Sequence, residues 1–417
     1  MPEVQETSEH DDQSRPSPRG PLSGLRVIDW TVWQQGPVAS AMLGDLGAEI
    51  IKLEERLHGD GGRSLYAVAG APTNSYFETN NRNKKSVTVD LKHPQGIAMV
   101  HELVAHADVF VHNFRAGVPE RLGLGYDDLR AVNPRLIYGE ATAFGSKGPE
   151  GSSRGHDLLG MARSGIMMAT ALPGSGEPRY PAGGMGDQMG ATMLAFGILA
   201  ALVARERFGV GQKVEASLLG GMMWLQGFAL AQQLAQGATG GPRDRTAQAN
   251  PLYNWYRCSD GKWLALATPQ SDRHWPELLE VLERTDLLED PRFADHMSRE
   301  RHAAACVRVL DEIFATRTRD DWLKRLASSG TVPHGPVNSL ADVVGDEQAL
   351  ANGYVTTFDH PVRGPVGVVG FPVSLSETPA MVRTRAPELG EHTEQVLIEL
   401  LGKDWDDLVR LRDAEVI

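Results

Sequence analysis

The fold is decided by residues 25–54, which read LRVIDWTVWQQGPVASAMLGDLGAEIIKLE. The apolar run Leu25–Trp30 predicts a strand, and Val38–Leu46 predicts a helix that leads into a second strand at Glu49–Glu54. Strand, helix and strand in so short a span form a βαβ unit. Because such crossovers are right-handed, we expect the turn Gln34–Pro37 at the carboxyl edge of a parallel sheet, where ligands usually bind.

The alternation of strands and helices continues beyond this unit. Further strands are predicted at Ser86–Asp90, Val109–His112 and Leu136–Gly139. The run Pro94–His106 predicts a helix between two of them. This pattern favours an α/β fold class with a doubly wound, Rossmann-like domain. No Gly-x-Gly-x-x-Gly follows the first strand, so we do not expect a nicotinamide or flavin dinucleotide site.

A different pattern begins near residue 250. The runs Tyr253–Cys258 and Trp263–Ala267 flank an Asp260-Gly261 turn and predict a β-hairpin. Helical patterns follow to about Ser328. We therefore expect a second, smaller α+β domain.

The amino-acid composition indicates which binding partners and which cellular compartment to expect. A chain of 417 residues is too long for one simple core, so two domains are expected. The 41 Lys and Arg against 54 Asp and Glu give a net charge of −13, which argues against nucleic acid or a membrane surface as a partner. Residues 1–20 are polar and lack an apolar h-region, which predicts a disordered tail rather than a signal peptide. Two cysteines offer neither a disulfide framework nor zinc spacing, so we expect a cytoplasmic protein without a metal site.

One carboxylate stands among glycines in the segment GGMGDQMG, residues 183–190, directly before an apolar helical run at Ala191–Val203. Asp187 is therefore expected at or next to a helix N-cap, where backbone N–H groups and the helix dipole keep a carboxylate ionised. An ionised and sterically open carboxylate is what covalent catalysis by a carboxylate needs. Aspartate is also a common helix cap, so this segment alone leaves a capping role and a nucleophilic role equally open.

Seven motifs in the same order resemble those of family III CoA-transferases, and together they extend over nearly the whole chain. No single motif is decisive; their number and order make the resemblance specific. The motifs are Pro21–Asp29, Gly36-Pro37, Leu46–Glu54, Asn81–Ser86, Asn113–Val118 with Arg121–Gly123, Gly186-Asp187 with Arg205–Gln212, and Pro387–Thr393.

This resemblance implies an interlocked homodimer, in which each chain threads through the other. It also implies a Rossmann-like large domain built from both chain ends, which we assign to residues 21–225 and 337–417, and a small α+β domain at residues 250–330. Residues 226–249 and 331–336 would link the two domains.

The resemblance further implies an enzyme that moves coenzyme A from an acyl-CoA to a free carboxylic acid, without a permanently bound cofactor. Asp187 aligns with the family's nucleophilic aspartate and would form an aspartyl-CoA intermediate. Taken singly, Arg121 and Lys84 are equally well explained as solvated surface charges, and Phe114 as a core residue. The resemblance places CoA contacts at Gln34, Gln35, Asn81, Arg82, Asn83, Lys84, Asn113, Phe114, Arg115, Arg121, Thr142, Ala143, Phe144 and Gly145.

Two features depart from the family pattern. Thr246–Asn250 lacks the glycine cluster that clamps over the intermediate in formyl-CoA transferase, so the covering loop must differ. Trp33 is larger than usual and is a candidate for lining the acyl pocket.

Gly155-His156-Asp157 raises a second possibility. α-Methylacyl-CoA racemases share the fold and pair a histidine in a Gly-His-Asp motif with the aspartate at the position of Asp187. His156 would then be a second acid–base group, because racemisation needs a base on each face of the α-carbon. The resemblance as a whole favours the transferase. An inactive CoA-binding scaffold is a third class, against which the retained Asp187 argues.

Overall fold

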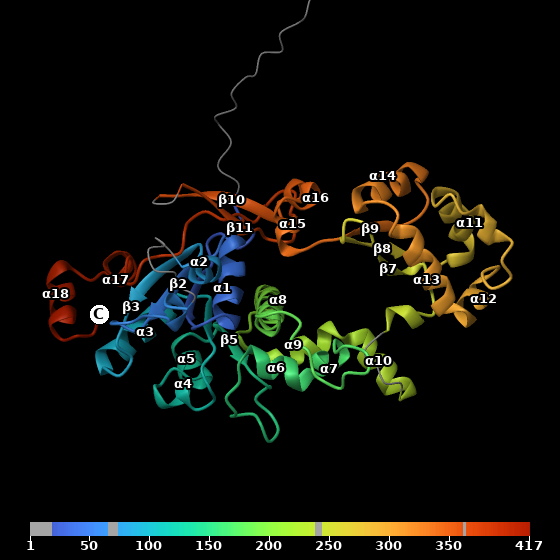
Figure 1. Cartoon of the computed structure of the whole chain (residues 1–417). Helices are drawn as coiled ribbons and strands as arrows, with labels where there is room; N and C mark the ends of the chain where they lie inside the picture. The colour runs from blue at the N-terminus through green and yellow to red at the C-terminus, as the bar shows by residue number, and fades with distance from the viewer. Residues whose placement is uncertain (1–18, 66–73, 238–243, 362–363) are drawn as a thin grey trace, which may run out of the picture. The chain divides into compact units, whose positions relative to one another are not determined.

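The structure, a computed structural model, describes residues 19–65, 74–237, 244–361 and 364–417 (Figure 1). These residues divide into two compact units. The first unit comprises the described residues up to Ile166, Tyr180–Ala235 and Ala351–Ile417, so both ends of the chain contribute to it. The second unit comprises Met167–Arg179 and the described residues of Gln236–Leu350. Residues 337–350, assigned above to the large domain, therefore belong to the second unit.

The first unit is built around a six-stranded parallel sheet with strand order β3-β2-β1-β4-β5-β6. The chain order reverses between β1 and β4, as in other doubly wound sheets. The predicted α/β class and parallel sheet are confirmed. The edge strand β6 was not predicted, because its QKVEAS sequence is largely polar and none of its side chains is fully buried. The strands are β1 (Arg26–Trp30), β2 (Glu49–Glu54), β3 (Lys84–Thr88), β4 (Val109–His112), β5 (Ile137–Thr142) and β6 (Gln212–Ser217).

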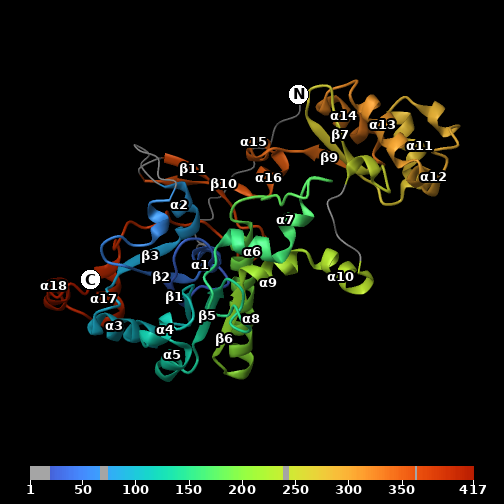
Figure 2. The ribbon, with the colours of Figure 1, turned by 60° about the horizontal axis from the view of Figure 1, so that its bottom comes forward.

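Helices cover both faces of this sheet, and alternate strand residues enter two separate cores. On one face α3, α5, α17 and α18 pack around Ile28 and Val87; on the other, α1 and α8 pack around Val27 and Ile50. Figures 1 and 2 both show the C-terminal helix α17 near α3. The helices of the first unit are α1 (Gln35–Asp45), α2 (Ser75–Asn81), α3 (Pro94–Ala105), α4 (Val118–Arg121), α5 (Tyr126–Val132), α6 (Asp157–Ser164), α8 (Met185–Phe208), α9 (Leu218–Leu225), α17 (Thr393–Leu401) and α18 (Trp405–Asp413), with a 3-10 turn η1 (Gly61–Arg63).

Helix α8 has 24 residues and is long and apolar enough to cross a membrane by length and composition alone. Its side chains Ala191, Leu194, Ile198 and Leu202 are buried in the core of the first unit, as in core helices of globular proteins. The helix begins at Met185 rather than near Ala191, so the glycine-rich segment is itself helical. Packing here overrides the low helix propensity of glycine.

The second unit is an antiparallel sheet of order β7-β8-β9 with helices packed against it. The hairpin predicted around Asp260-Gly261 is confirmed, since β7 (Tyr253–Arg257) pairs with β8 (Trp263–Ala267). The expected linker at 331–336 instead contains the start of β9 (His334–Val337). The helices are α11 (Ser271–Val281), α12 (His296–Arg301), α13 (Ala303–Phe314), α14 (Arg319–Ser329) and α15 (Leu340–Val344), with 3-10 turns η2 (Arg245–Ala247) and η3 (Thr285–Leu288).

Three short helices lie where the chain passes between units: α7 (Ile166–Ala169), α10 (Gly227–Gln236) and α16 (Glu347–Ala351). Part of the expected linker 226–249 is therefore helical, and its residues 238–243 lie outside the described residues. A second hairpin, formed by β10 (Val355–His360) and β11 (Gly364–Val369), belongs to the first unit.

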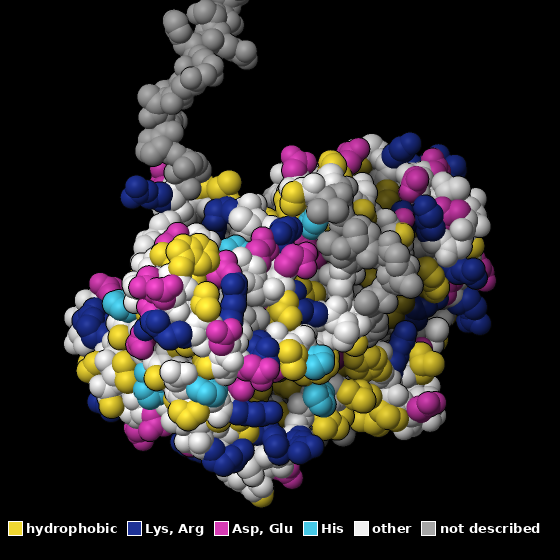
Figure 3. All heavy atoms as spheres, turned by 90° about the vertical axis from the view of Figure 1, so that its left-hand side faces the viewer, with side chains coloured by type: hydrophobic (Ala, Val, Ile, Leu, Met, Phe, Trp, Pro, Cys, Tyr) yellow, Lys and Arg dark blue, Asp and Glu magenta, His cyan; other side chains and the backbone are white. Residues whose placement is uncertain are grey.

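Charge of both signs is spread over the surface. On the face shown in Figure 3, acidic and basic side chains are interspersed.

Candidate active site

A cavity of about 360 Å³ lies at the carboxyl edge of the six-stranded sheet. Its walls are the segments that follow β1, β4, β5 and β6, together with the first turn of α8. It brings Asp187 and His156 together with seven of the fourteen predicted CoA-binding residues. The lining residues are Val32, Trp33, Gln34, Gln35, Asn113, Phe114, Arg115, Val118, Ala141, Thr142, Ala143, Arg154, Gly155, His156, Asp187 and Leu218.

The N-terminus of α8 is capped by a carboxylate from a different helix. Asp157, the first residue of α6, accepts hydrogen bonds from the backbone N–H groups of Gly184, Gly186 and Asp187 at 2.9, 2.7 and 3.1 Å. Its Oδ2 also accepts from the Tyr180 hydroxyl at 2.8 Å. These bonds satisfy donors that a helix leaves free at its start. Asp187 itself is thus free of the capping role.

The sequence predicted that the backbone N–H groups at the start of α8 keep Asp187 ionised. This prediction is wrong, because these groups do not bind Asp187. Those amides bind the Asp157 carboxylate instead. Burial, and then the nearby charge of Asp157, raise the pKa of Asp187 to about 7. A half-buried carboxyl beside a second carboxylate resists ionisation. Asp187 is consequently an acid–base group poised near neutral pH, a property that marks functional sites.

Two glycines beside Asp187 allow glutamines from α1 to approach closely. A Cβ on Gly184, whose φ is +76°, would lie 2.5 Å from Nε2 of Gln34. A Cβ on Gly190 would lie 2.6 Å from Nε2 of Gln35. These glycines therefore leave room for Gln34 and Gln35 of the same chain. Both glutamine side chains can approach the turn that carries Asp187.

The structure does not bring the predicted contacts at Asn81–Lys84 to this cavity. All four side chains are buried at the start of β3. This is the amino end of the strand, whereas the cavity lies at the carboxyl ends of the strands. Arg82 pairs with Asp45 at 2.7 Å, and Lys84 pairs with Asp29 at 2.8 Å. Asn83 also donates to Asp45. These residues hold the first unit together and do not line this cavity; their contact with CoA stays a prediction.

Three further predicted residues lie outside the walls of the cavity. Arg121 is exposed at the end of α4. The Phe144 ring packs against the Arg163 guanidinium, 5.0 Å from the ring centroid. The Gly145 N–H donates to Thr142 Oγ1 at 3.1 Å and so shapes the turn after β5.

A second, more apolar cavity of about 370 Å³ adjoins the first, and the two share Val32 and Phe114. Its walls follow β1, β2, β3 and β4. The Phe114 ring stacks on Trp30 with centroids 4.2 Å apart. Together the two cavities extend along the carboxyl edge from β3 to β6, which suits an elongated ligand.

Reasoning from the sequence missed two important residues. Asp157 was noted only as part of a motif, although it caps α8 and raises the pKa of Asp187. Arg154 was not considered, although it lines the cavity two residues before His156. Within the described part of the chain, neither Arg154 nor Arg115 has a carboxylate within ion-pair distance. The proximity of Arg154 to the Gly-His-Asp motif was the available signal.

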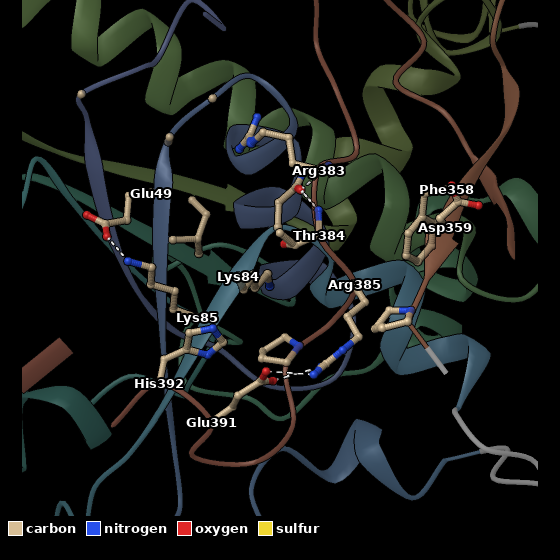
Figure 4. A pocket seen from close by; sticks show the side chains of 17 residues that line it. Glu49, Lys84, Lys85, Phe358, Asp359, Arg383, Thr384, Arg385, Glu391 and His392 are labelled. Atoms are coloured by element: carbon tan, nitrogen blue, oxygen red, sulfur yellow. Dashed lines mark hydrogen bonds and ion pairs between the residues drawn. The ribbon is translucent and has the colours of Figure 1, made fainter. Parts of the chain in front are cut away.

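A larger cavity, of about 580 Å³, lies at the opposite, amino edge of the sheet. Figure 4 shows two ion pairs among the side chains that line it. Lys85 contacts Glu49 at 2.7 Å and Arg385 contacts Glu391 at 2.8 Å. Lys84, which also lines this cavity, pairs with Asp29 and has its pKa lowered to about 8, chiefly by burial. Arg383 donates to the Gly44 carbonyl oxygen.

Comparison with known proteins identifies what the chain is similar to. Residues 22–393 match a family model described as CoA-transferase family III. The chain is 34% identical to succinyl-CoA:glutarate CoA-transferase of Mus musculus over 95% of this chain and 90% of that protein. It is 32% identical to (R)-2-hydroxy-4-methylpentanoate CoA-transferase of Clostridioides difficile, over 95% and 99% of the two chains. The crystal structure of a CAIB/BAIF family protein from Brucella suis matches with a TM-score of 0.82 and 32% identity, covering 92% of this chain and all of that one.

Proposed function

The chain belongs to CoA-transferase family III, and from this we propose that it transfers coenzyme A through a covalent aspartyl-CoA intermediate on Asp187. The observation that carries the proposal is the position of Asp187 in a cavity at the carboxyl edge of the sheet, with a pKa raised to about 7. An Asp of this pKa is more basic than an ordinary aspartate. It is a stronger nucleophile once ionised.

In the proposed reaction, a carboxylate oxygen of Asp187 attacks the thioester carbonyl of the donor. The C–S bond breaks, CoA leaves as the thiolate, and Asp187 and the acyl group form a mixed anhydride. The thiolate then attacks the Asp187 carbonyl, which releases the donor acid as a carboxylate and leaves CoA on Asp187 as a thioester. The acceptor carboxylate repeats these steps in reverse, so no net proton is taken up or released.

The two adjoining cavities support a binding path for CoA along the carboxyl edge. The thioester would lie at the β6 end, beside Asp187 and Gln34. The adenine would lie toward the apolar cavity near Phe114, where a flat base finds apolar and aromatic walls. Arg115 and Arg121 follow β4, between these ends, and would bind the phosphates.

Arg154 supports a preference for acids that carry a second carboxylate. Arg154 lines the cavity and has no ion-pair partner among the described residues. Relatives named for glutarate and for L-malate act on dicarboxylic acids. Arg154→Gln would then raise KM for a dicarboxylate acceptor about five- to tenfold and leave a monocarboxylate unaffected. An equal change for both acids would exclude this role.

The decisive experiment is to trap the covalent intermediate. We would incubate the enzyme with succinyl-CoA, quench with hydroxylamine, and map the modified peptide by mass spectrometry. Modification at Asp187 supports the proposal. Full CoA transfer by Asp187→Ala, or modification only elsewhere, would rule it out.

Racemisation of a 2-methylacyl-CoA remains the second candidate, because His156 and Asp187 line the same cavity. The two activities are distinguished by two incubations in deuterated water, one without an acceptor acid and one with it. Deuterium on the α-carbon indicates the racemase, whereas CoA transfer to an added acid, with no exchange at the α-carbon, indicates the transferase.

We also propose that the protein works as an interlocked homodimer in the cytoplasm. Large apolar side chains on α8, α9 and α10 are exposed in the single chain, including Phe196, Trp224 and Phe228 at 67%, 73% and 74%. Such apolar surface is usually covered by another protein surface. Light scattering after size-exclusion chromatography would give twice the mass of one chain; a monomer at micromolar concentration would contradict the proposal.

A further inference from the structure

Three successive residues in the turn between β1 and α1 are hydrogen-bonded through their backbone to side chains from β2 and from the loops that follow β2 and β4. The Lys52 ammonium donates to the carbonyl oxygen of Thr31 at 2.8 Å. The Asn113 side chain both accepts from the Val32 N–H and donates to the Val32 carbonyl, at 2.9 and 2.7 Å. Oδ1 of Asp60 accepts from the Trp33 N–H at 2.9 Å. This turn forms one wall of the candidate active site.

Two of these side chains form an ion pair that is removed from solvent. Nζ of Lys52 lies 2.9 Å from Oδ2 of Asp60, and both side chains have no exposed surface. Burial lowers the pKa of Lys52, but the carboxylates of Asp60 and Asp29 outweigh it and the pKa is raised. The pair therefore stays charged. Breaking such a pair by removing one partner is costly, because the other charge stays buried and uncompensated.

The backbone that this pair holds is strained. Trp33 has a φ of +68°, in the left-handed region that a bulky residue rarely adopts. Its indole ring lies on Gly61, where an added Cβ would be 2.7 Å from two ring carbons. Asp60, which precedes Gly61, also caps η1 by accepting from the Gly62 N–H. The same carboxylate thus fixes both the strained turn and the surface on which Trp33 rests.

The strained turn has a direct consequence at the reacting end of the cavity. Gln34 follows Trp33, and its side-chain amide lies against Gly184, three residues before Asp187. A change in the Trp33 backbone would move Gln34 away from this position. An amide there is suited to donate a hydrogen bond to an oxyanion formed at the Asp187 carbonyl.

We infer that Lys52 and Asp60 are positioning residues, whose buried ion pair holds the left-handed turn at Trp33 and so keeps Gln34 beside Asp187. This inference rests on the proposed function. Lys52 lines neither cavity, whereas Asp60 is among the residues that line the apolar cavity. Because both side chains have no exposed surface, we expect them to act through the backbone of the turn. Their loss should therefore lower kcat more than it changes KM for the acyl-CoA.

The test compares Asp60→Asn with a matched control at the other edge of the sheet. Asp45 forms an equally buried ion pair with Arg82 at 2.7 Å, far from the turn, so Asp45→Asn tests the general cost of breaking a buried pair. Active sites are counted by the hydroxylamine-trapped adduct, and kcat is expressed per active site. We expect Asp60→Asn to lower kcat about 10- to 100-fold with KM for acyl-CoA within about threefold, and Asp45→Asn to keep kcat within about twofold. The pH midpoint of the reaction should stay the same in both variants.

A second variant tests the same inference without breaking the buried ion pair, in case Asp60→Asn fails to fold. Gly61→Ala keeps the ion pair but places a methyl group against the Trp33 ring, so it too should lower kcat with KM little changed. The inference is overturned if Gly61→Ala has the kcat of the wild type, or if Asp60→Asn and Asp45→Asn lose kcat equally. Failure of the proposed function would be visible separately, as the absence of an Asp187 adduct in the wild-type enzyme.

Discussion

The two edges of the parallel sheet both carry cavities, but they differ in how their charges are satisfied. At the amino edge the cavity is the larger, about 580 Å³, yet Lys85 and Arg385 are each paired with a glutamate. At the carboxyl edge the cavity is about 360 Å³ and contains Asp187, whose pKa is raised to about 7 by burial and Asp157. The raised pKa of Asp187, and not cavity size, is our reason for proposing the carboxyl edge as the site of chemistry.

The strongest way to break this comparison is to remove one charge from each edge. Asp187→Asn should lower CoA transfer by at least about 10³-fold, since the covalent step loses its nucleophile. Lys85→Gln, at the amino edge, should change the rate by less than about twofold. Both rates are measured by transfer of CoA to an added acid. Comparable losses in the two variants would mean that the two edges do not differ in function.

The pH dependence of the rate tests the electrostatic side of the comparison. In the proposed mechanism only the ionised form of Asp187 attacks the thioester, and the pKa of Asp187 is raised to about 7. We therefore expect kcat/KM to rise about tenfold per pH unit below 7 and to level off above about 8. A plateau that extends down to pH 5 would show that Asp187 has an ordinary carboxyl pKa.

Asp157 provides a sharper test of why the pKa is raised. Asp157→Asn keeps the size of the side chain and one hydrogen-bond acceptor for the amides at the start of α8, but it removes the second carboxylate. Because burial is the larger cause of the shift, the midpoint of the pH profile should fall by only about one unit. An unchanged midpoint would leave burial as the sole cause.

The smallest expected effect is on thermal stability. The pKa of Asp187 in the folded protein is above the usual value of 3.8 for an aspartate, so the folded state binds this proton more tightly than the unfolded state does. The resulting stabilisation is complete below about pH 4 and is lost as pH rises to about 7. Asp187→Asn cannot ionise, so it should raise Tm by about 2–4 °C at pH 8. Little change is expected at pH 4, and a lower Tm at pH 8 would contradict the assignment of a disfavoured charge.

Local patterns in the sequence were sufficient for the framework. The βαβ unit at residues 25–54 and the hairpin around Asp260-Gly261 follow from apolar periodicity and turn residues, which act over a few positions. The strand β6 escaped prediction because its stability comes from pairing with β5 and from α8, not from its own polar sequence.

The candidate site was predicted only where motif residues follow a strand at the carboxyl edge. Gln34, Asn113 and Thr142 meet this condition and line the cavity. Asn81–Lys84 do not, because they lie just before and at the first residue of β3, and so at the amino edge with buried partners. A motif shared with a family does not state which end of a strand its residues occupy.

Local periodicity and motifs in the sequence were enough for the class of fold, the family resemblance and the choice of Asp187 as the candidate nucleophile. Only the tertiary structure decided the ionisation of Asp187, since that depends on burial and on Asp157, 30 residues away in the chain. It also decided that Lys52 and Asp60 support the turn at Trp33. Contacts between distant segments set the local dielectric and the partners of each charge, and these govern its pKa.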